Sequence, residues 1–437
     1  MNREALIMVC TSDIAGQVRG KGFPAQDLKS RMTSGIGWTP TNLMITAFGP
    51  IAPSPWGALD DLILLPDPTT EAHVDFGDGS PPEHFFLGDI LTLDGQPWDC
   101  CGRSFLKAAL AELEGHGLGL FAAFEHELYY DGALERIGSG YNLDSIRRQG
   151  AFAESFLHAL IAARLEPDSF LPEYGPRQYE VTCRPAIGVT AADRAVILRE
   201  LARATAIRLG QRVSFAPMVR PDGGVGNGLH IHMSLRDLNG RPVTYDPDSP
   251  SGLSEPAGRF VAGILRHMPA LCAFTAPSVV SYARLVPHKW SAAYNNLGTR
   301  DREAGVRICP LNPRAGTDAA EQFNFEYRAA DSTASPYVAL GVLVRAGLEG
   351  LKAKLPAPPD TPNVPGDLDD AAWAKRGIVR LPQSLGTALD ALEADTAARA
   401  WLPPAFLDAY LRYKRFEIGL MEGLSLDELC ARYSEAY

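Results

Sequence analysis

The chain has 437 residues, of which 46% are hydrophobic and 21% are charged, and its formal net charge is −11. This length favours two domains, and the composition is that of an ordinary globular protein. The acidic balance argues against a nucleic-acid partner, because binding to phosphates requires clustered lysine and arginine. We expect no contact with a membrane, since no stretch approaches the roughly 20 apolar residues of a spanning helix.

The seven cysteines are scattered along the chain, and none of them forms a C-x-x-C pair. This distribution is typical of a reduced protein without a disulfide framework. The apolar run near the N-terminus is too short for a signal peptide. We therefore expect a cytoplasmic protein.

The first part of the chain is predicted to be rich in strands. Apolar runs between proline- and glycine-rich turns predict strands at residues 5–10, 42–48 and 60–67. The first hundred residues are therefore expected to form a small sheet-rich domain. A helix is predicted from Ser104 to Glu114, with glycines following it, and a strand at residues 119–130.

The rest of the chain mixes helices and strands. Helical spacing of apolar residues predicts helices at 145–165, 191–210, 255–276 and from Pro336 onward. Strands are predicted at 173–183, 228–235 and 323–330. Residues 355–370, rich in proline and aspartate, predict a surface loop before a helical C-terminal part. Because no regular βαβ order is visible, the sequence predicts an α+β fold with domains at 1–100 and 101–437.

Four of the strand-like segments carry acidic or histidine residues where a buried face would normally be apolar. Residues i and i+2 of a strand share a face, so Glu125 with Glu127, and His230 with His232, point the same way. The other two segments contribute Glu173, Gln178, Glu180, Glu326 and Arg328. Each segment alone is equally explained by a solvated strand face or by hydrogen-bonded histidines.

Five glutamates and two histidines together indicate a metal site built on a sheet. A buried carboxylate is destabilising unless it is paired or bound to a cation. Oxygen-rich ligand sets suit Mg²⁺ or Mn²⁺. We expect no cysteine near these motifs and therefore no thiolate zinc site.

Arginines add a second signal. Arg284, Arg302 and Arg307 have the guanidinium geometry that binds carboxylate or phosphate, although each alone could equally be a surface or structural residue. Beside a metal site they suggest phosphoryl transfer, in which positioning and charge neutralisation supply most of the catalysis. The chain has no G-x-x-x-x-G-K-[ST] loop, so it is not expected to be a P-loop enzyme.

The ordered series of motifs resembles the glutamine synthetase superfamily over almost the whole chain. The matches are E-x-E at 125–127, E-x-x-x-x-Q-x-E at 173–180, G-x-G-x-H-x-H-x-S-L at 226–235, R-L-V-P at 284–287, R-x-x-x-x-R at 302–307 and E-x-R-x-x-D-x-x-x-S-P-Y at 326–337. The resemblance implies a small N-terminal β-grasp domain at residues 1–100 and a larger catalytic domain at 101–437. It also implies a homo-oligomer of stacked hexameric rings, with active sites shared between subunits.

The resemblance assigns roles to the matching positions. One metal ion would be held by Glu127, Glu173 and Glu180, and a second by Glu125, His230 and Glu326. The substrate glutamate would be bound by Gly226, Arg284 and Arg328. ATP would be bound by His232, Ser234, Arg302 and Arg307, and the two arginines would neutralise the transferred phosphoryl group.

The implied reaction has two steps and uses ATP with Mg²⁺ or Mn²⁺. ATP phosphorylates the γ-carboxylate of glutamate, and a nitrogen nucleophile then displaces phosphate to form a γ-glutamyl amide. The phosphorylation is needed because a carboxylate by itself resists attack by an amine.

The chain departs from ammonia-using members of the family at the flap that follows R-L-V-P. Those members have a glutamate three residues after the proline, and this chain has Trp290. An indole can cover a site but cannot accept a proton from ammonium. Members that act on larger amines tend to have tryptophan there. Phe48 and Trp56, in the N-terminal domain, would add an apolar wall or, alternatively, pack at a subunit interface.

Two further departures concern the neighbouring pockets. Val225 replaces a frequent asparagine before G-x-G, and Asn324 replaces an arginine before Glu326. These changes could alter recognition of glutamate and of phosphate. The base that deprotonates the amine is left open among Asp60, Asp61 and His288.

The sequence thus predicts an ATP-dependent ligase that joins glutamate to an organic primary amine, similar to the γ-glutamylpolyamine and γ-glutamyl-amine branch of the family. Candidate amines are a short alkylamine, an aromatic amine such as aniline, ethanolamine or a polyamine. The alternatives are an ammonia-using glutamine synthetase and a catalytically silent member with a structural or regulatory role.

Overall fold

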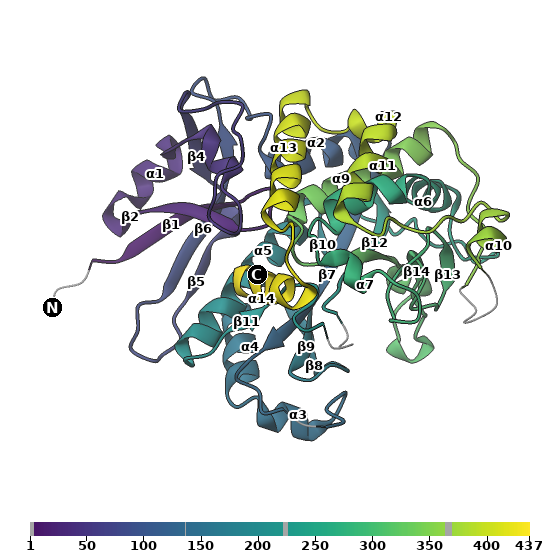
Figure 1. Cartoon of the computed structure of the whole chain (residues 1–437), viewed down its shortest axis with the longest axis horizontal. Helices are drawn as coiled ribbons and strands as arrows, with labels where there is room; N and C mark the ends of the chain where they lie inside the picture. The colour runs from purple at the N-terminus through teal and green to yellow at the C-terminus, as the bar shows by residue number, and fades with distance from the viewer. Residues whose placement is uncertain (1–3, 136, 222–225, 363–368) are drawn as a thin grey trace.

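The computed structural model describes residues 4–135, 137–221, 226–362 and 369–437. Val225, one of the positions that departs from the family pattern, lies outside these ranges. Figure 1 shows a small N-terminal sheet beside a larger part in which a second sheet is covered by helices. The predicted α+β fold is therefore confirmed. No helix in the described ranges is long and apolar enough to cross a membrane.

The N-terminal sheet has the strand order β2-β1-β6-β4-β3, with β5 paired to β6. Its strands are β1 (Leu6–Ser12), β2 (Val18–Pro24), β3 (Ile36–Trp38), β4 (Leu62–Pro66), β5 (Ala72–Val74) and β6 (Glu83–Leu91). The predicted strands at 5–10 and 60–67 correspond to β1 and β4. In β4 the side chains alternate between buried and half-buried, as a sheet with one covered face requires.

The strand predicted at residues 42–48 is wrong. Residues Pro40–Met44 form a 3₁₀ helix instead. Pro40 occupies its first turn, where the fixed backbone angle of proline suits helical geometry and its missing N–H is not needed. Leu43 and Met44 are buried by this turn, so an apolar run that reads as a strand serves the core in another conformation.

The large sheet has the order β13-β14-β15-β12-β7-β9-β8, and β10 and β11 pair with β7. Its strands are β7 (Leu118–Tyr130), β8 (Pro167–Pro172), β9 (Gln178–Cys183), β10 (Ala186–Ile187), β11 (Val213–Ser214), β12 (Leu229–Asp237), β13 (Leu297–Thr299), β14 (Val306–Ile308) and β15 (Phe325–Ala330). The central pairs β12–β7, β7–β9 and β12–β15 are antiparallel. The three strands predicted to carry acidic or histidine residues after residue 170 correspond to β9, β12 and β15.

Helices are distributed through the whole chain. They are α1 (Leu28–Ser34), α2 (Gly102–Gly115), α3 (Leu143–Arg148), α4 (Phe152–Ala162), α5 (Val189–Arg208), α6 (Glu255–Thr275), α7 (Ser281–Arg284), α8 (Ala319–Gln322), α9 (Pro336–Lys352), α10 (Asp370–Ala374), α11 (Leu385–Ala394), α12 (Thr396–Arg399), α13 (Pro404–Leu420) and α14 (Leu426–Ala436). The single helix predicted at 145–165 is divided into α3 and α4. Gly150, with φ of 68°, separates them in a left-handed conformation that helices do not contain.

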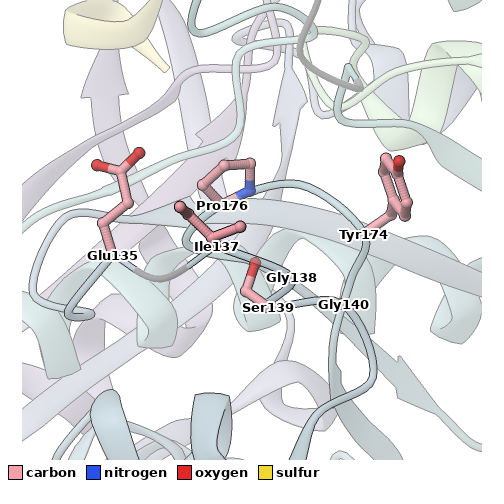
Figure 2. A pocket seen from close by; sticks show the side chains of 7 residues that line it. All are labelled: Glu135, Ile137, Gly138, Ser139, Gly140, Tyr174 and Pro176. Carbon is pink, nitrogen blue, oxygen red and sulfur yellow. The ribbon is translucent and has the colours of Figure 1, made fainter.

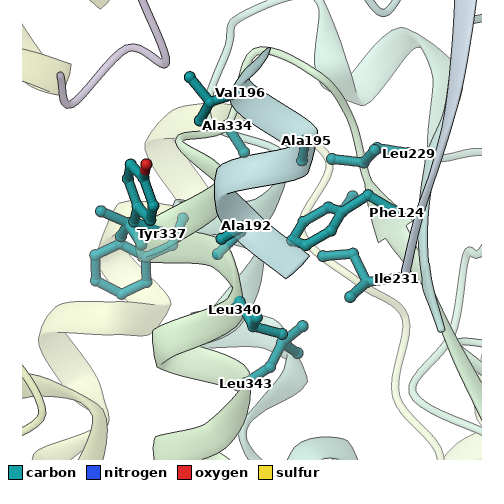
Figure 3. Close-up of a cluster of buried hydrophobic side chains, with 14 of the residues drawn as sticks. Phe124, Ala192, Ala195, Val196, Leu229, Ile231, Ala334, Tyr337, Leu340 and Leu343 are labelled. Atoms are coloured by element: carbon teal, nitrogen blue, oxygen red, sulfur yellow. The ribbon is translucent and has the colours of Figure 1, made fainter. Parts of the chain in front are cut away.

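The core of the larger part lies between the large sheet and helices α5 and α9. Figure 3 shows Phe124 of β7 and Ile231 of β12 facing Ala192 and Ala195 of α5, with Leu340 of α9 close by. All of these side chains are buried. Successive side chains of a strand point to opposite faces of the sheet, so the residues between these apolar ones point to the other face. The opposite face is where the candidate site is found.

A buried arginine joins the N-terminal sheet to the larger part. Arg103 of α2 is 1% exposed and bonds Asp67 at 2.8 Å, Asp89 at 3.1 Å and Asp193 of α5 at 2.9 Å. Asp67 and Asp89 belong to the segments around β4 and β6. The guanidinium thus binds three carboxylates that come from different parts of the chain, as its planar fork of donors allows. Lys107 adds a second positive charge at 2.6 Å from Asp89.

Replacing Arg103 with methionine should lower the free energy of unfolding by about 3–5 kcal/mol, because Asp193 would remain buried without its cationic partner. Urea denaturation at one fixed protein concentration measures this change. The control is Arg412→Met, which removes an exposed pair with Asp408 and should change stability by less than about 1 kcal/mol. Equal effects of the two substitutions would contradict the role given to Arg103.

Candidate active site

The register of the large sheet brings the predicted site residues together on one face. His230 lies opposite Glu125 across β12 and β7, and Glu127 lies opposite Glu180 across β7 and β9. On the other side of β12, His232 lies opposite Glu326 of β15. Four neighbouring strands, β15, β12, β7 and β9, therefore supply the cluster. The two-residue period of each strand keeps these side chains on the face opposite the apolar core.

The two histidines share Glu125. Its carboxylate oxygens lie 3.0 Å from Nδ1 of His230 and 3.2 Å from Nε2 of His232. Burial opposes ionisation of Glu125, but the bonds to both imidazoles outweigh it and hold the pKa well below its ordinary value. Burial and the charge of Arg328 lower the pKa of His230. For His232, burial is outweighed by Glu326, and its pKa lies well above the ordinary value.

Glu326 is balanced by three cationic groups. It is 1% exposed, and its Oε1 accepts bonds from Arg307 at 2.8 Å and Arg328 at 2.6 Å. Its Oε2 lies 2.9 Å from Nε2 of His232. Burial would raise the pKa of Glu326, but His232 and Arg328 hold it well below the usual range. This end of the site therefore has its charges paired.

The other end of the site is acidic and lacks such pairing. Glu127 is 9% exposed and accepts bonds from the Gly228 N–H at 2.7 Å and from Gln178 at 3.0 Å. Burial raises the pKa of Glu127 to about 7. Burial and the charge of Glu125 raise the pKa of Glu180 to about 10. Buried carboxylates that repel one another in this way are stabilised when a divalent cation binds between them.

Glu173 lies at the outer edge of this acidic end. Its carboxylate accepts bonds from the hydroxyl of Tyr141 at 3.0 Å and from the Tyr174 N–H at 2.8 Å. The charge of Glu173 contributes to the raised pKa values of both Glu127 and Glu180. All three predicted carboxylates therefore interact electrostatically. Tyr141, which no motif in the sequence identified, is part of the same arrangement.

The donor set fits the predicted ions, but the close groups differ from the predicted division. One ligand atom each of Glu125, Glu180 and His230 lies within 4.8 Å of the others, and so does one each of His232, Cys309 and Glu326. Glu180 thus lies with Glu125 and His230, and Glu326 lies with His232. Carboxylates and imidazoles are suitable ligands for Mg²⁺ or Mn²⁺. The assignment of six ligands to two ions stays a prediction.

The expectation that no cysteine lies near the metal motifs is wrong. Cys309 directly follows β14, and its Sγ lies 3.7 Å from Nδ1 of His232. The sequence places Cys309 two residues after Arg307, so the pairing of β14 with β15 was the missing information. A strand pairing between distant segments cannot be read from the spacing of one motif.

Arg284 is buried beside the glycine-rich turn before β12. It donates to Ser291 Oγ at 3.2 Å and to the Ala330 carbonyl at 2.5 Å. A Cβ on Gly226 would lie 2.8 Å from Cγ of Arg284, and a Cβ on Gly228 only 3.2 Å from its Nη1. The two glycines therefore allow the guanidinium to approach this turn. A cavity of about 150 Å³ touches both Gly226 and Arg284.

The remaining predicted residues lie around this centre. Ser234 follows His232 on the same face of β12 and is half-buried. The side chain of Arg302 is exposed, while its carbonyl accepts a bond from Nε of Arg328 at 2.9 Å. Nδ1 of His232 lies 3.0 Å from Oδ1 of Asn324, so Asn324 contacts an imidazole where the family has an arginine. The structure thus brings Arg307 into the cluster and leaves Arg302 at its rim.

Trp290 lies in a short loop that is held by Glu303. The indole is 67% exposed, and both His288 and Trp290 have positive φ, at 62° and 55°. Their N–H groups donate to the two carboxylate oxygens of Glu303 at 3.3 and 3.1 Å. The Trp290 carbonyl accepts from Arg328 at 3.4 Å. This backbone connects the loop to the site, and Glu303 was missed because its partners are main-chain groups.

The aromatic residues expected to line the amine site are engaged elsewhere in the chain. The rings of Phe48 and Tyr433 meet edge to face with their centroids 5.0 Å apart. The ring centroids of Trp56 and Trp98 are 5.3 Å apart. Asp60 and Asp61 are exposed and precede β4 of the N-terminal sheet. The apolar wall expected from Phe48 and Trp56, and the part of Asp60 or Asp61 as the base that deprotonates the amine, stay predictions.

A larger cavity lies beside the acidic end of the site. Its volume is about 610 Å³, and Figure 2 shows its walls, formed by Glu135, Ile137, Gly138, Ser139, Gly140, Tyr174 and Pro176. Tyr174 directly follows Glu173 and donates its N–H to that carboxylate. Glu135 is paired with Arg220 at 3.1 Å, so its charge is already balanced. The cavity therefore has a mainly apolar lining next to a predicted metal ligand.

Comparison with known proteins connects this geometry to one family. Residues 99–427 match the glutamine synthetase catalytic domain, and residues 1–98 match the glutamine synthetase N-terminal domain. The chain is 34% identical to γ-glutamylpolyamine synthetase GlnA3 of Streptomyces coelicolor, over 99% of this chain and 93% of that protein. It is 30% identical to a glutamine synthetase of Thermococcus kodakarensis, over 95% of this chain and 89% of that protein.

Solved structures give the same result. A crystal structure described as a novel glutamine synthase homolog superposes with a TM-score of 0.93 at 43% identity, over 100% of this chain and 99% of the other. The ADP complex of GmaS has a TM-score of 0.82 at 24% identity, over 97% and 95% of the two chains, and supports the fold alone.

Divalent metal should stabilise the protein through its acidic end. At a Mn²⁺ concentration one hundred times the Kd, the expected gain is about 2.7 kcal/mol, visible as a higher Tm. Glu180→Gln should leave the metal-free Tm nearly unchanged at pH 7, because burial and the charge of Glu125 raise the pKa of that carboxyl and favour its protonated form. The same substitution should remove more than half of the shift caused by Mn²⁺. The exposed Glu422→Gln is the control, and a full Mn²⁺ shift in Glu180→Gln would exclude Glu180 as a ligand.

The bonds from Glu303 should restrain the loop that carries Trp290. Glu303→Ala should therefore increase the rate of tryptic cleavage after the exposed Lys289 several-fold, as measured by mass spectrometry of the fragments. Glu435→Ala, an exposed substitution in α14, should leave that rate unchanged. If Glu303→Ala did not accelerate cleavage at Lys289, other contacts would have to hold the loop.

Proposed function

The chain belongs to the glutamine synthetase family, whose members are ATP-dependent carbon–nitrogen ligases, and from this premise we propose that it joins glutamate to an organic primary amine. The observation that carries the choice of amine is Trp290, which occupies the flap position where ammonia-using members have a glutamate. The similarity to a γ-glutamylpolyamine synthetase supports this choice. The similarity to glutamine synthetases keeps ammonia as the alternative nucleophile.

Glutamate is proposed to bind between the glycine turn and the buried arginines. Arg284 and Arg328 would pair with its carboxylates, and Gly226 would let the substrate approach the main chain. The cavity of about 150 Å³ that touches Gly226 and Arg284 supports this placement. The γ-carboxylate would then point toward the acidic end, where Glu127, Glu173 and Glu180 are proposed to hold a divalent cation.

ATP is proposed to bind over the charge-paired end of the site. Arg307 already lies on the sheet beside Glu326, and the exposed Arg302 can turn toward a phosphate without breaking a buried bond. Two guanidinium groups at this place would neutralise the charge of the transferred phosphoryl group. His232 and Ser234 would lie along the phosphates, and Glu125, His230 and Glu326 would hold the second cation. The cations would polarise phosphate oxygens and fix their positions.

The amine is proposed to enter between the Trp290 loop and the cavity beside Glu173. An indole supplies an apolar cover and no proton acceptor. The apolar walls of the cavity, and the pairing of Glu135 with Arg220, favour an alkyl or aromatic group over the distal ammonium of a polyamine. Which base deprotonates the amine is left open, with His288 in the same loop as one candidate.

The proposal includes two broader properties, the cellular compartment and the assembly. The cysteines are all free thiols, which suits the cytoplasm, where ATP is also available. Assembly as a homo-oligomer of stacked hexameric rings is proposed by analogy with the family. Size-exclusion chromatography with light scattering would give the number of subunits directly.

The test of the proposed function is phosphate release from ATP, glutamate and Mg²⁺ across a panel of amines. The panel contains ammonia, methylamine, isopropylamine, ethanolamine, putrescine and aniline, and the γ-glutamyl products are identified by mass spectrometry. We expect strong turnover with one organic amine and weak turnover with ammonia. Preference for ammonia would make the protein a glutamine synthetase, and no turnover with any amine would favour a catalytically silent member.

Trp290 should decide between ammonia and the organic amine. Trp290→Glu restores a carboxylate that can attract ammonium and accept its proton. We expect the ratio of kcat/KM for ammonia to kcat/KM for the organic amine to rise at least tenfold. Trp290→Phe keeps an apolar ring and should retain the original preference. An unchanged ratio in Trp290→Glu would remove Trp290 from the amine site.

A further inference from the structure

We propose that His232, Cys309 and Glu326 form a third metal site, selective for a soft divalent cation such as Zn²⁺. The site differs from the carboxylate-rich positions proposed for Mg²⁺ or Mn²⁺ because it contains a thiol. It shares Glu326 with the second of those positions, so the two ions would compete for this carboxylate. The existence of the site is independent of the ligase reaction. Only its consequence for turnover rests on the proposed function, through His232 and Glu326.

The distances suit tetrahedral coordination. One ligand atom from each of the three residues lies within 4.8 Å of the others. In a tetrahedral zinc site, Zn–S bonds of about 2.3 Å and Zn–N bonds of about 2.0 Å place sulfur and nitrogen roughly 3.5 Å apart. The Sγ of Cys309 and Nδ1 of His232 are 3.7 Å apart. The sulfur and the nitrogen are therefore almost at the separation that two ligands of one zinc ion have, before any ion binds.

Oxygen atoms are available to complete the coordination. Oε2 of Glu326 lies 2.9 Å from Nε2 of His232, and Oδ1 of Asn324 lies 3.0 Å from its Nδ1. The carboxylate, and either the Asn324 amide or a water molecule, would give four ligands. Arg307 and Arg328 both donate to Oε1 of Glu326, so Oε2 is the oxygen that would coordinate the ion.

The thiol decides which ion is selected. Thiolate and imidazole favour Zn²⁺ over Mg²⁺, which prefers oxygen ligands and retains its water. Cys309 is half-buried, whereas the other six cysteines are buried, so ions can reach its sulfur from solvent. On binding, the thiol loses its proton to solvent, and no electron transfer takes place.

An ion at this site would remove two groups from the proposed nucleotide side. His232 now contacts both Glu125 and Glu326, and binding through Nδ1 and Sγ would draw the imidazole and Glu326 toward Cys309. Zn²⁺ is therefore expected to inhibit turnover in competition with the magnesium complex of ATP. The site would make the ligase sensitive to free zinc.

Cobalt spectroscopy tests the site without any measurement of activity. Metal-stripped protein is titrated with Co²⁺, and the near-ultraviolet charge-transfer absorption of a cobalt–thiolate bond is recorded. We expect one equivalent of this absorption in the wild type and its loss in Cys309→Ser. The control Cys183→Ala, which removes a buried cysteine of β9, should retain it. Absence of the band in the wild type, or its persistence in Cys309→Ser, would overturn the proposal.

Zinc affinity and thiol protection provide the second measurement. Competition with a chromophoric chelator should show Zn²⁺ affinity at least tenfold weaker in Cys309→Ser than in the wild type. If that variant does not fold, alkylation of the wild type by iodoacetamide replaces it, and Zn²⁺ should protect Cys309 alone. Unprotected Cys309 at saturating Zn²⁺ would contradict the site. Failure of the amine panel with an intact cobalt–thiolate band would overturn only the proposed reaction.

Discussion

The site depends on the close approach of several glutamate carboxyl groups. The antiparallel pairing of neighbouring strands places them next to one another. Once β7 pairs with β9 and β12, Glu125, Glu127 and Glu180 share one face, and none of them can turn into the apolar core on the other. Isolated buried carboxylates strongly disfavour ionisation. The sheet therefore has an acidic centre that the proposed cation would complete, and the fold around it limits where that cation could bind.

The carboxyl groups at the two ends of this centre are stabilised in different ways. At the β15 end, Arg307, Arg328 and His232 surround Glu326 and keep its pKa low. At the β9 end, the pKa values of Glu127 and Glu180 are raised instead. The first end is organised before a ligand arrives, while the second awaits positive charge. The proposed reaction, which would move a phosphoryl group from the first end to the second, would use both conditions.

The sequence predicted the residues of the centre better than their partners. The i, i+2 spacing is enough to place two side chains on one strand face, and the long helices follow from apolar periodicity, as in α6 and α9. Spacing contains no information on which strands pair. For that reason the sequence did not predict that Cys309 lies beside His232 or that Tyr141 lies beside Glu173. It also did not predict that Glu180 lies with Glu125 and His230. The apolar run at 42–48 failed for a different reason, because Pro40 favours a helical turn that local hydrophobicity does not distinguish from a strand.

In the loop after α7, a carboxylate holds the main chain of the segment that carries Trp290. Trp290 removes the acidic side chain from the flap, yet Glu303 places a carboxylate within hydrogen-bonding distance of the same segment. Glu303 bonds the N–H groups of two residues with positive φ, a conformation that side chains other than glycine adopt at an energetic cost of order 1 kcal/mol or more. The carboxylate thus stabilises the shape of the loop and is occupied by main-chain donors. In the proposed reaction, an indole on a loop held in this way would cover the organic amine, and the proton of that amine would leave by another group.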